Sequence, residues 1–97
     1  MIIRIVKMTF RPQAVTEFLH IFEQSKEHIR GFEGCERLEL LQHAEQEHVF
    51  FTYSWWQHPD HLEAYRHSEL FKEVWGNTKA LFGDKPEAWS LTKKVEL

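Results

Sequence analysis

The pattern of apolar and polar residues at 2–10 predicts a β-strand, with Ile2, Val6, Met8, Phe10 and Arg4 on one face and Ile3, Ile5, Lys7 and Thr9 on the other. Apolar residues then recur at helical spacing, and this pattern predicts a helix that begins near Pro12 and ends at Gly31. Proline suits the first turn of a helix, and glycine accepts the left-handed backbone that often ends one. The buried side of this helix is expected to carry Val15, Phe18, Leu19, Phe22 and Ile29.

The rest of the chain alternates between the same two periodicities. The segments are predicted, in order, as a strand at 35–43, a polar hairpin loop at 43–48, a strand at 50–56, a short helix opened by His58-Pro59-Asp60, a second helical stretch down to residue 82 and a strand at 87–96. Ser68 is placed to cap the second helical stretch, because a serine oxygen can accept a hydrogen bond from a free backbone N–H there.

The resulting order, β-α-β-β-α-β, predicts a single α+β domain over residues 1–97 with the ferredoxin-like arrangement. Its sheet is expected to have four antiparallel strands. Right-handed crossovers place the first and third strands in the centre. Those two strands carry apolar side chains on both faces, whereas the second and fourth alternate more cleanly, as edge strands do.

The third strand, FFTYSWW at residues 50–56, needs cover on both of its faces. Both long helical segments lie on one side of the predicted sheet, so nothing in the chain covers the other side. Each large apolar side chain left in water forgoes about 1.5–3 kcal/mol of burial. We therefore expect a homodimer through the sheet face. The alternative is that bulky neighbours or the C-terminal tail partly cover that face.

Composition narrows the classes of partner. The chain of 97 residues is 42% hydrophobic and 28% charged, with a formal net charge of -3 and no basic run, so a nucleic-acid partner is not expected. No segment is long and apolar enough to span a membrane, and the start lacks the apolar stretch of a signal peptide. Cys35 is the single cysteine, which excludes an intrachain disulfide and is typical of a cytoplasmic protein.

The passage TYSWWQHPDHLEAYRHSELF resembles the hallmark of the antibiotic biosynthesis monooxygenase family. In that family a strand ends in Glu-x-Trp, and a polar turn, an Ala-led helix, His-x-x-Ser and a Phe three residues on follow. The matching residues are Trp56, Ala64, Ser68 and Phe71, and the turn GFEGC also resembles the glycine-rich turn of the family. The resemblance implies that two ferredoxin-like subunits pair as a dimeric α+β barrel.

Two positions depart from the family pattern. Ser54 stands where the family has the Glu, and Tyr65 stands where it has a helix His. Haem-degrading members use an Asn, a Trp and a haem-ligating His at the positions that correspond to Val6, Tyr65 and Trp75. Because all three differ and Trp75 cannot bind iron, the resemblance does not imply haem chemistry.

The resemblance implies a cavity between sheet and helices, in which a small aromatic or quinol-type metabolite is oxidised by dioxygen without metal, flavin or other cofactor. The expected catalytic residues are Arg4 as anion partner, Tyr65 as hydrogen-bond donor and His20 as general base; the expected substrate-binding residues are Val6, Trp56, Phe71 and Trp75. Plainer roles stay open. The aromatic residues can be ordinary core, Arg4 can reach solvent or a carboxylate, and Tyr65 can simply anchor its hydroxyl.

The seven histidines do not predict a metal site. His58 and His61 are three apart at a helix start and His67 follows, but such a pair without a third fixed ligand is weak evidence. Cys35 has no neighbouring base and is expected to be structural. Besides the monooxygenase, two functions stay open: a non-catalytic homodimer that binds a small ligand, and an isomerase or lyase on the same scaffold.

Overall fold

The computed structural model describes residues 1–97. Its elements are β1 (Ile2–Thr9), α1 (Val15–Arg30), β2 (Cys35–Gln42), β3 (Val49–Trp56), α2 (Pro59–Arg66), α3 (Glu69–Lys79) and β4 (Glu87–Leu91), with a 3₁₀ turn at Pro12–Ala14 before α1. This order confirms the predicted β-α-β-β-α-β sequence of elements, in which α2 and α3 together fill the second helical connection. None of these helices has the length and apolar character that crossing a bilayer requires.

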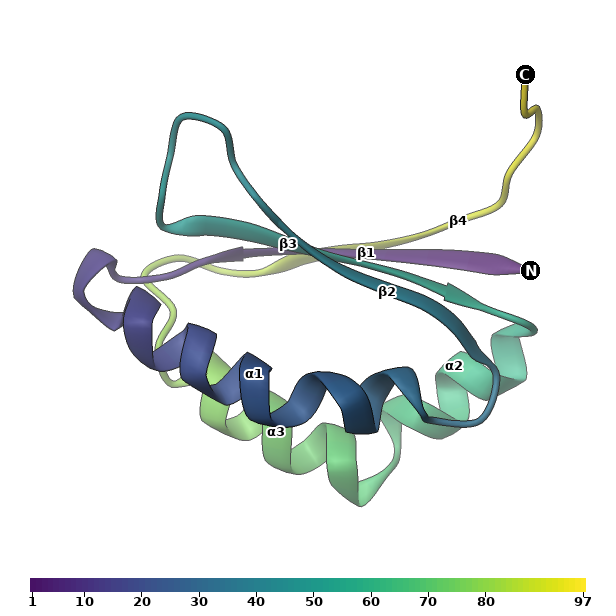
Figure 1. Ribbon diagram of the computed structural model, residues 1–97, viewed down its shortest axis with the longest axis horizontal. Helices are drawn as coiled ribbons and strands as arrows, with labels where there is room; N and C mark the ends of the chain where they lie inside the picture. The colour runs from purple at the N-terminus through teal and green to yellow at the C-terminus, as the bar shows by residue number, and fades with distance from the viewer.

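The four strands form one antiparallel sheet in the order β2-β3-β1-β4. The prediction that the first and third strands are central is confirmed. Figure 1 shows the helices gathered on one face of this sheet, with α1 and α3 side by side beneath the strands. The protein is therefore a two-layer α+β structure of the ferredoxin-like class, and the opposite face of the sheet has no helix on it.

Two clusters of buried side chains join the sheet to the helices. At one end of the layer, Phe10, which directly follows β1, stacks on Phe18 of α1 with ring centroids 4.1 Å apart. That cluster consists of Met8, Phe10, Ala14, Phe18, Phe50 and Leu81. The other end holds a smaller cluster of Cys35, Trp56 and Leu62. The space between the two clusters is where a cavity lies.

The second helical region begins as the sequence predicts. Ser68 caps α3, since its Oγ accepts a hydrogen bond from the backbone N–H of Phe71 at 3.1 Å. His58 caps α2 in the same way, because its Nδ1 accepts from the N–H of Asp60 at 3.0 Å. The capping role of His58 was not predicted, because histidine is not among the residues that usually cap helices.

Three predictions of backbone geometry, boundary and burial are wrong. Gly31 ends α1 with φ of -81°, so the left-handed glycine of this turn is Gly34, with φ of +86°. The last strand ends at Leu91 and not at Glu96, because Leu91 pairs with Ile3 and β1 offers only one further residue to pair with. Leu19 is 42% exposed, although its spacing placed it on the buried side of the helix. The bulky Phe18 takes the inward position, and the next residue along an α-helix points about 100° away from it.

The face of the sheet without helices is apolar in its centre and only partly covered. Pairing places Trp55 beside Ile3, which in turn lies beside Leu91. Ile3 is buried by these two neighbours, whereas Leu91 remains 44% exposed. Lys93 of the C-terminal segment lies over the Trp55 ring, 4.3 Å from its centre. The tail therefore covers Trp55, but it leaves other large apolar groups of this face in water.

Candidate functional site

A cavity of about 290 Å³ lies between the sheet and the helices, at the lower end of the usual range for small-ligand sites. It is lined by 20 residues, 13 of them hydrophobic. The strands contribute their helix-facing positions, which alternate along β1 and β3, and all three helices contribute to the opposite wall. The predicted cavity between sheet and helices is therefore present in the structure.

Four aromatic rings form a continuous wall along this cavity. Trp56 stacks on Tyr65, with ring centroids 5.0 Å apart and planes inclined by 26°. Tyr65 meets Phe71 edge-on at 5.3 Å, and Phe71 stacks on Trp75 at 5.9 Å. Such offset and edge contacts are the favoured geometries of aromatic pairs, and each adds to the energy of burial. The wall presents flat apolar surface to a ligand of similar shape.

The position of Trp56 in this wall is fixed by a polar contact that sequence reasoning missed. Its indole N–H donates a hydrogen bond to the Oγ of Ser54 at 3.0 Å, and both residues are buried. Ser54 and Trp56 are two apart on β3, so their side chains share a face of the sheet. A serine two residues before a buried tryptophan on one strand is the only sequence signal for this contact.

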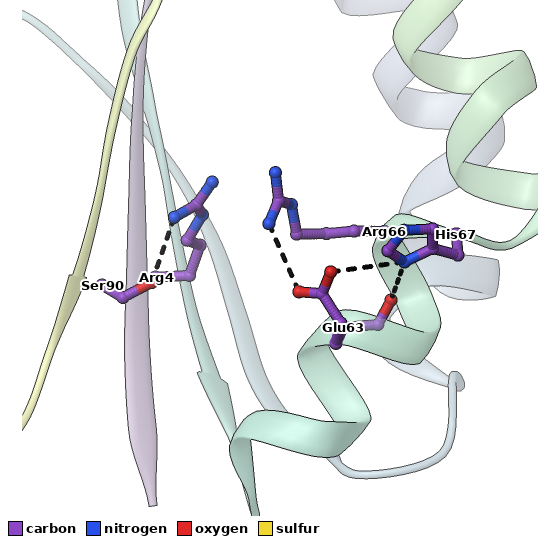
Figure 2. Close-up of polar contacts among 5 residues, drawn as sticks. All are labelled: Arg4, Glu63, Arg66, His67 and Ser90. Carbon is purple, nitrogen blue, oxygen red and sulfur yellow. Dashed lines mark hydrogen bonds and ion pairs between the residues drawn. The ribbon is translucent and has the colours of Figure 1, made fainter.

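Arg4 brings a half-buried positive charge to the cavity. It extends from β1 on the helix side, and its guanidinium donates a hydrogen bond to the Oγ of Ser90 on β4 at 3.0 Å (Figure 2). Burial lowers the pKa of Arg4, and the nearby charge of Arg66 lowers it further, while Glu63 acts in the opposite direction. Its hydrogen-bond partner is a neutral hydroxyl, so the charge is not matched by a carboxylate in direct contact.

Arg66 is a lining residue that the sequence analysis did not identify. It is the last residue of α2 and pairs with Glu63, one turn earlier, at 3.4 Å. The Nδ1 of His67 also lies 3.4 Å from the Glu63 carboxylate, and Figure 2 shows these groups together opposite Arg4. One sequence signal could have identified Arg66. It lies four residues after the buried Leu62, so the two side chains share one side of the helix.

Tyr65 lines the cavity between Trp56 and Phe71, and its environment keeps it protonated. Burial raises the pKa of its phenol well above the ordinary value, and the neighbouring Cys35 raises it further. A neutral phenol can donate a hydrogen bond but does not act as a base at physiological pH. The structure thus brings Tyr65 to the cavity in a form that suits the predicted donor role.

Most of the predicted site residues come together, and one does not. The residues that line the same cavity are Arg4, Val6, Trp56, Tyr65, Phe71 and Trp75. His20 does not line it, because it lies on the exposed side of α1. The expectation that His20 borders the pocket is therefore corrected. Phe18 points inward toward the sheet. His20 is two residues later, about 200° around the helix axis from Phe18, and so points away from the sheet.

His58, His61 and Cys35 have structural roles. His61 packs beneath Gly34, where a Cβ would come within 2.2 Å of the imidazole, so only glycine fits at that turn. His58 caps α2, and no cluster of three or more histidine, cysteine or acidic side chains has an arrangement suited to a metal ion. Cys35 is buried against Trp56 and Leu62, and burial raises the pKa of its thiol, so it is held in the unreactive form.

No histidine lines the cavity. Glu87 is the one acidic residue in its lining, and its carboxylate pairs with Lys7 at 3.9 Å. Lys7 belongs to the set of β1 residues that face away from the helices, so this carboxylate is drawn away from the cavity. The site therefore offers positive charge, a neutral phenol and aromatic surface, but no side chain placed as a general base.

The family model described as antibiotic biosynthesis monooxygenase matches residues 1–75 of the chain. The fold also matches solved structures over nearly its whole length. A conserved protein from Methanosarcina mazei is 24% identical, with a TM-score of 0.89 over 96% of this chain and 93% of that one. An antibiotic biosynthesis monooxygenase is 16% identical, with a TM-score of 0.92 over 98% of this chain and all of the other.

A third solved structure is a variant of SnoaB from Streptomyces nogalater, which is described as a cofactor-independent oxygenase. It is 18% identical, with a TM-score of 0.88 over 99% of this chain and 95% of that one. A comparison with curated proteins gave no match. At these identities the likeness to solved structures establishes the fold alone, and the family model carries the assignment to a family.

Proposed function

Because the chain belongs to the antibiotic biosynthesis monooxygenase family, we propose that it oxidises a small aromatic or quinol-type molecule with dioxygen and without a cofactor. One observation carries this proposal: a half-buried guanidinium, that of Arg4, lines a mostly hydrophobic cavity with an aromatic wall and has only a neutral hydroxyl as hydrogen-bond partner. A phenolate is the form of such a substrate that donates electrons to oxygen, and this cavity is built to hold it.

The reaction balances without an outside reductant. The ionised substrate transfers one electron to dioxygen, and the radical pair combines at a ring carbon that bears hydrogen, ortho or para to the oxygen. The resulting hydroperoxide loses water. One oxygen atom stays in the product as a carbonyl, the other leaves in the water with the two hydrogens of the substrate, and the substrate supplies all the electrons.

Arg4 is the proposed anion partner in this reaction. A positive charge in contact with an acid favours the ionised form and lowers the pKa of that acid by about 1–3 units. The effect is strengthened in a cavity with few competing waters. With Arg4 in place, the phenol can lose its proton to solvent at the cavity mouth, which explains how the site functions without a side chain as general base.

The remaining lining residues hold and orient the ring. Trp56, Phe71 and Trp75 give flat surfaces for stacking, and Val6 closes the sheet side between them. Tyr65 donates a hydrogen bond from its hydroxyl group to a substrate oxygen, since its pKa is raised and the phenol stays neutral. Holding the ring in one orientation beside oxygen lowers the entropic part of the barrier.

Oxygen consumption by metal-free protein tests this function. A panel of naphthols, quinols and anthrones is offered in the presence of a chelator, and product is identified by the incorporation of one atom of labelled oxygen. We expect turnover with at least one of them. Arg4→Gln should shift the rise of kcat to higher pH by about 1–3 units, since the bound substrate then ionises without a neighbouring positive charge. Turnover by no member of the panel contradicts the proposal.

A second candidate is a binding protein that uses the same cavity without chemistry. The absence of a general base among the lining residues favours it, as does Ser54 in place of the family glutamate. A binder would be stabilised against heat by an aromatic ligand that is recovered unchanged. Oxygen uptake with the same ligand would decide against this candidate.

We further propose that the chain works as a homodimer joined through the face of the sheet that has no helix. Leu41, Trp89 and Leu91 lie on this face and are each more than 40% exposed, beside the partly buried rings of β3. A second copy would remove these groups from water and, by two-fold symmetry, cover the same face of each protomer. The C-terminal tail covers Trp55 but not these three residues.

A further inference from the structure

Arg4 and Arg66 face one another across one side of the cavity (Figure 2). Arg4 comes from the central strand β1, and Arg66 comes from the last turn of α2. The two charges are close enough that Arg66 lowers the pKa of Arg4. Two guanidiniums held in this way repel one another. An anion between them would attract both and so offset their repulsion.

Acidic groups near this pair do not neutralise it. Arg4 bonds to the hydroxyl of Ser90 only, so its charge has no contacting carboxylate. Glu63 contacts Arg66 at 3.4 Å, but its side chain is 57% exposed and also faces the Nδ1 of His67. Two guanidiniums against one solvated carboxylate leave this part of the cavity with an excess of positive charge.

We propose that Arg4 and Arg66 together recognise a small hydroxy-aromatic acid, in which a carboxylate lies on the ring carbon next to the hydroxyl group. This inference rests on the proposed function and names its substrate class. The phenolate oxygen lies against Arg4, as the oxidation requires. The substrate carboxylate binds Arg66, whose planar guanidinium can donate two parallel hydrogen bonds to the two carboxylate oxygens.

The position of Arg66 suits a residue that selects the substrate. Its side chain is 44% exposed, so it lies at the rim of the cavity and can exchange Glu63 for an entering carboxylate. The aromatic wall of Trp56 and Tyr65 lies on the same side as the α2 helix and gives the ring a surface to stack on. The cavity volume of about 290 Å³ favours one or two fused rings over a large polycycle.

Binding without oxygen tests the inference separately from catalysis. The probes are 1-hydroxy-2-naphthoate and its methyl ester, which differ in the negative charge of one group. Affinity is measured by calorimetry and by quenching of tryptophan fluorescence, under nitrogen so that no turnover occurs. We expect the acid to bind at least about tenfold more tightly than the ester. Equal affinities, or no saturable binding of the acid, would overturn the inference.

The variants assign the preference to Arg66. Arg66→Gln should remove the preference of acid over ester, and Arg66→Lys should retain part of it. Lys72→Gln is the matched control, because Lys72 forms the same i,i+3 ion pair with Glu69 on an exposed helix surface and does not line the cavity. A preference that survives Arg66→Gln would show that another group binds the carboxylate. Circular dichroism of each variant checks that it is folded.

Oxygen uptake separates this inference from the proposed function. Monooxygenation of 1-hydroxy-2-naphthoate at the carbon para to its hydroxyl would give a naphthoquinone carboxylate and water. If the acid binds through Arg66 but no probe is oxidised, the proposed function fails and the anion subsite stands. If uncharged naphthols are oxidised as well as the acid and bind as tightly, the function stands and the subsite fails.

Discussion

Trp56 donates its indole N–H to the Oγ of Ser54 at 3.0 Å, on the helix-facing side of β3, where both residues are buried. Trp56 also stacks on Tyr65, so this single hydrogen bond orients the first ring of the cavity wall. The hydroxyl satisfies a donor that would otherwise be buried without a partner. Structure and site thus depend on the same contact.

Replacing this serine should destabilise the protein out of proportion to the atom removed. Ser54→Ala leaves the indole N–H unpaired, which costs about 1–3 kcal/mol of unfolding free energy. Urea denaturation measures the effect. In a Trp56→Phe background the donor is gone, so the same serine replacement should cost much less. Additive losses in the double variant would show that the hydrogen bond does not stabilise the fold.

Stability should fall in alkaline solution because of buried groups that resist ionisation. The pKa values of Tyr65 and Cys35 are raised in the folded state, chiefly by burial, so the unfolded chain releases these protons at lower pH than the folded one. The contribution of these two groups to the free energy of unfolding is complete below their ordinary pKa values, near 8.5 for Cys and 10 for Tyr. It is lost as the pH rises beyond those values.

For Tyr65 the loss should approach about 1.4 kcal/mol for each pH unit above 10. Tyr65→Phe removes the ionisable group, so its unfolding free energy should decline less steeply over that range than that of the parent. The measurement is urea denaturation at several pH values between about 8 and 12. Parallel curves for the two proteins would contradict a raised pKa for this phenol.

Sheet-to-sheet association should be sensitive to a charge on the uncovered face. Leu91→Glu places a carboxylate among apolar groups of the proposed interface, and we expect it to convert the dimer to monomer in size-exclusion chromatography with light scattering. Leu19→Glu is the matched control, since Leu19 is 42% exposed and Leu91 is 44% exposed, but Leu19 lies on the helix layer. A monomeric parent protein, or dissociation by the control alone, would refute this interface.

Two glycines should respond in opposite ways to the same substitution. Gly34 has φ of +86°, and a Cβ there would lie 2.2 Å from the His61 ring. Gly34→Ala should therefore cost more than the 1–2 kcal/mol of the backbone alone. Gly76 lies inside α3 with nothing within 4 Å of an added Cβ, so Gly76→Ala should stabilise by about 0.5–1 kcal/mol. Thermal unfolding compares them, and similar shifts would disprove this distinction.

Element order and the choice of central strands could be predicted because they depend on local pattern. Residues 2–10 and 50–56 are rich in β-branched and aromatic side chains with apolar groups on both faces, which is enough to place these strands inside a sheet. The N-cap at Ser68 and the turn before residue 35 are also local, since each depends on the hydrogen bonds or backbone angles of a few residues. Long-range contacts were not needed for any of these inferences.

The sequence by itself thus determined the ferredoxin-like order and the central strands, because these depend on local pattern, and the family resemblance added six residues that line the cavity. Only the tertiary structure decided that His20 points to solvent, that Arg66 faces Arg4, and that Ser54 holds Trp56. The first two depend on how far a helix is rotated about its axis and on which side chains meet across layers, and the third depends on the rotamers that packing selects for two side chains on one face of β3. None of these is fixed by periodicity, since apolar residues of α1 span a wide arc and packing of Phe18 selects one part of it.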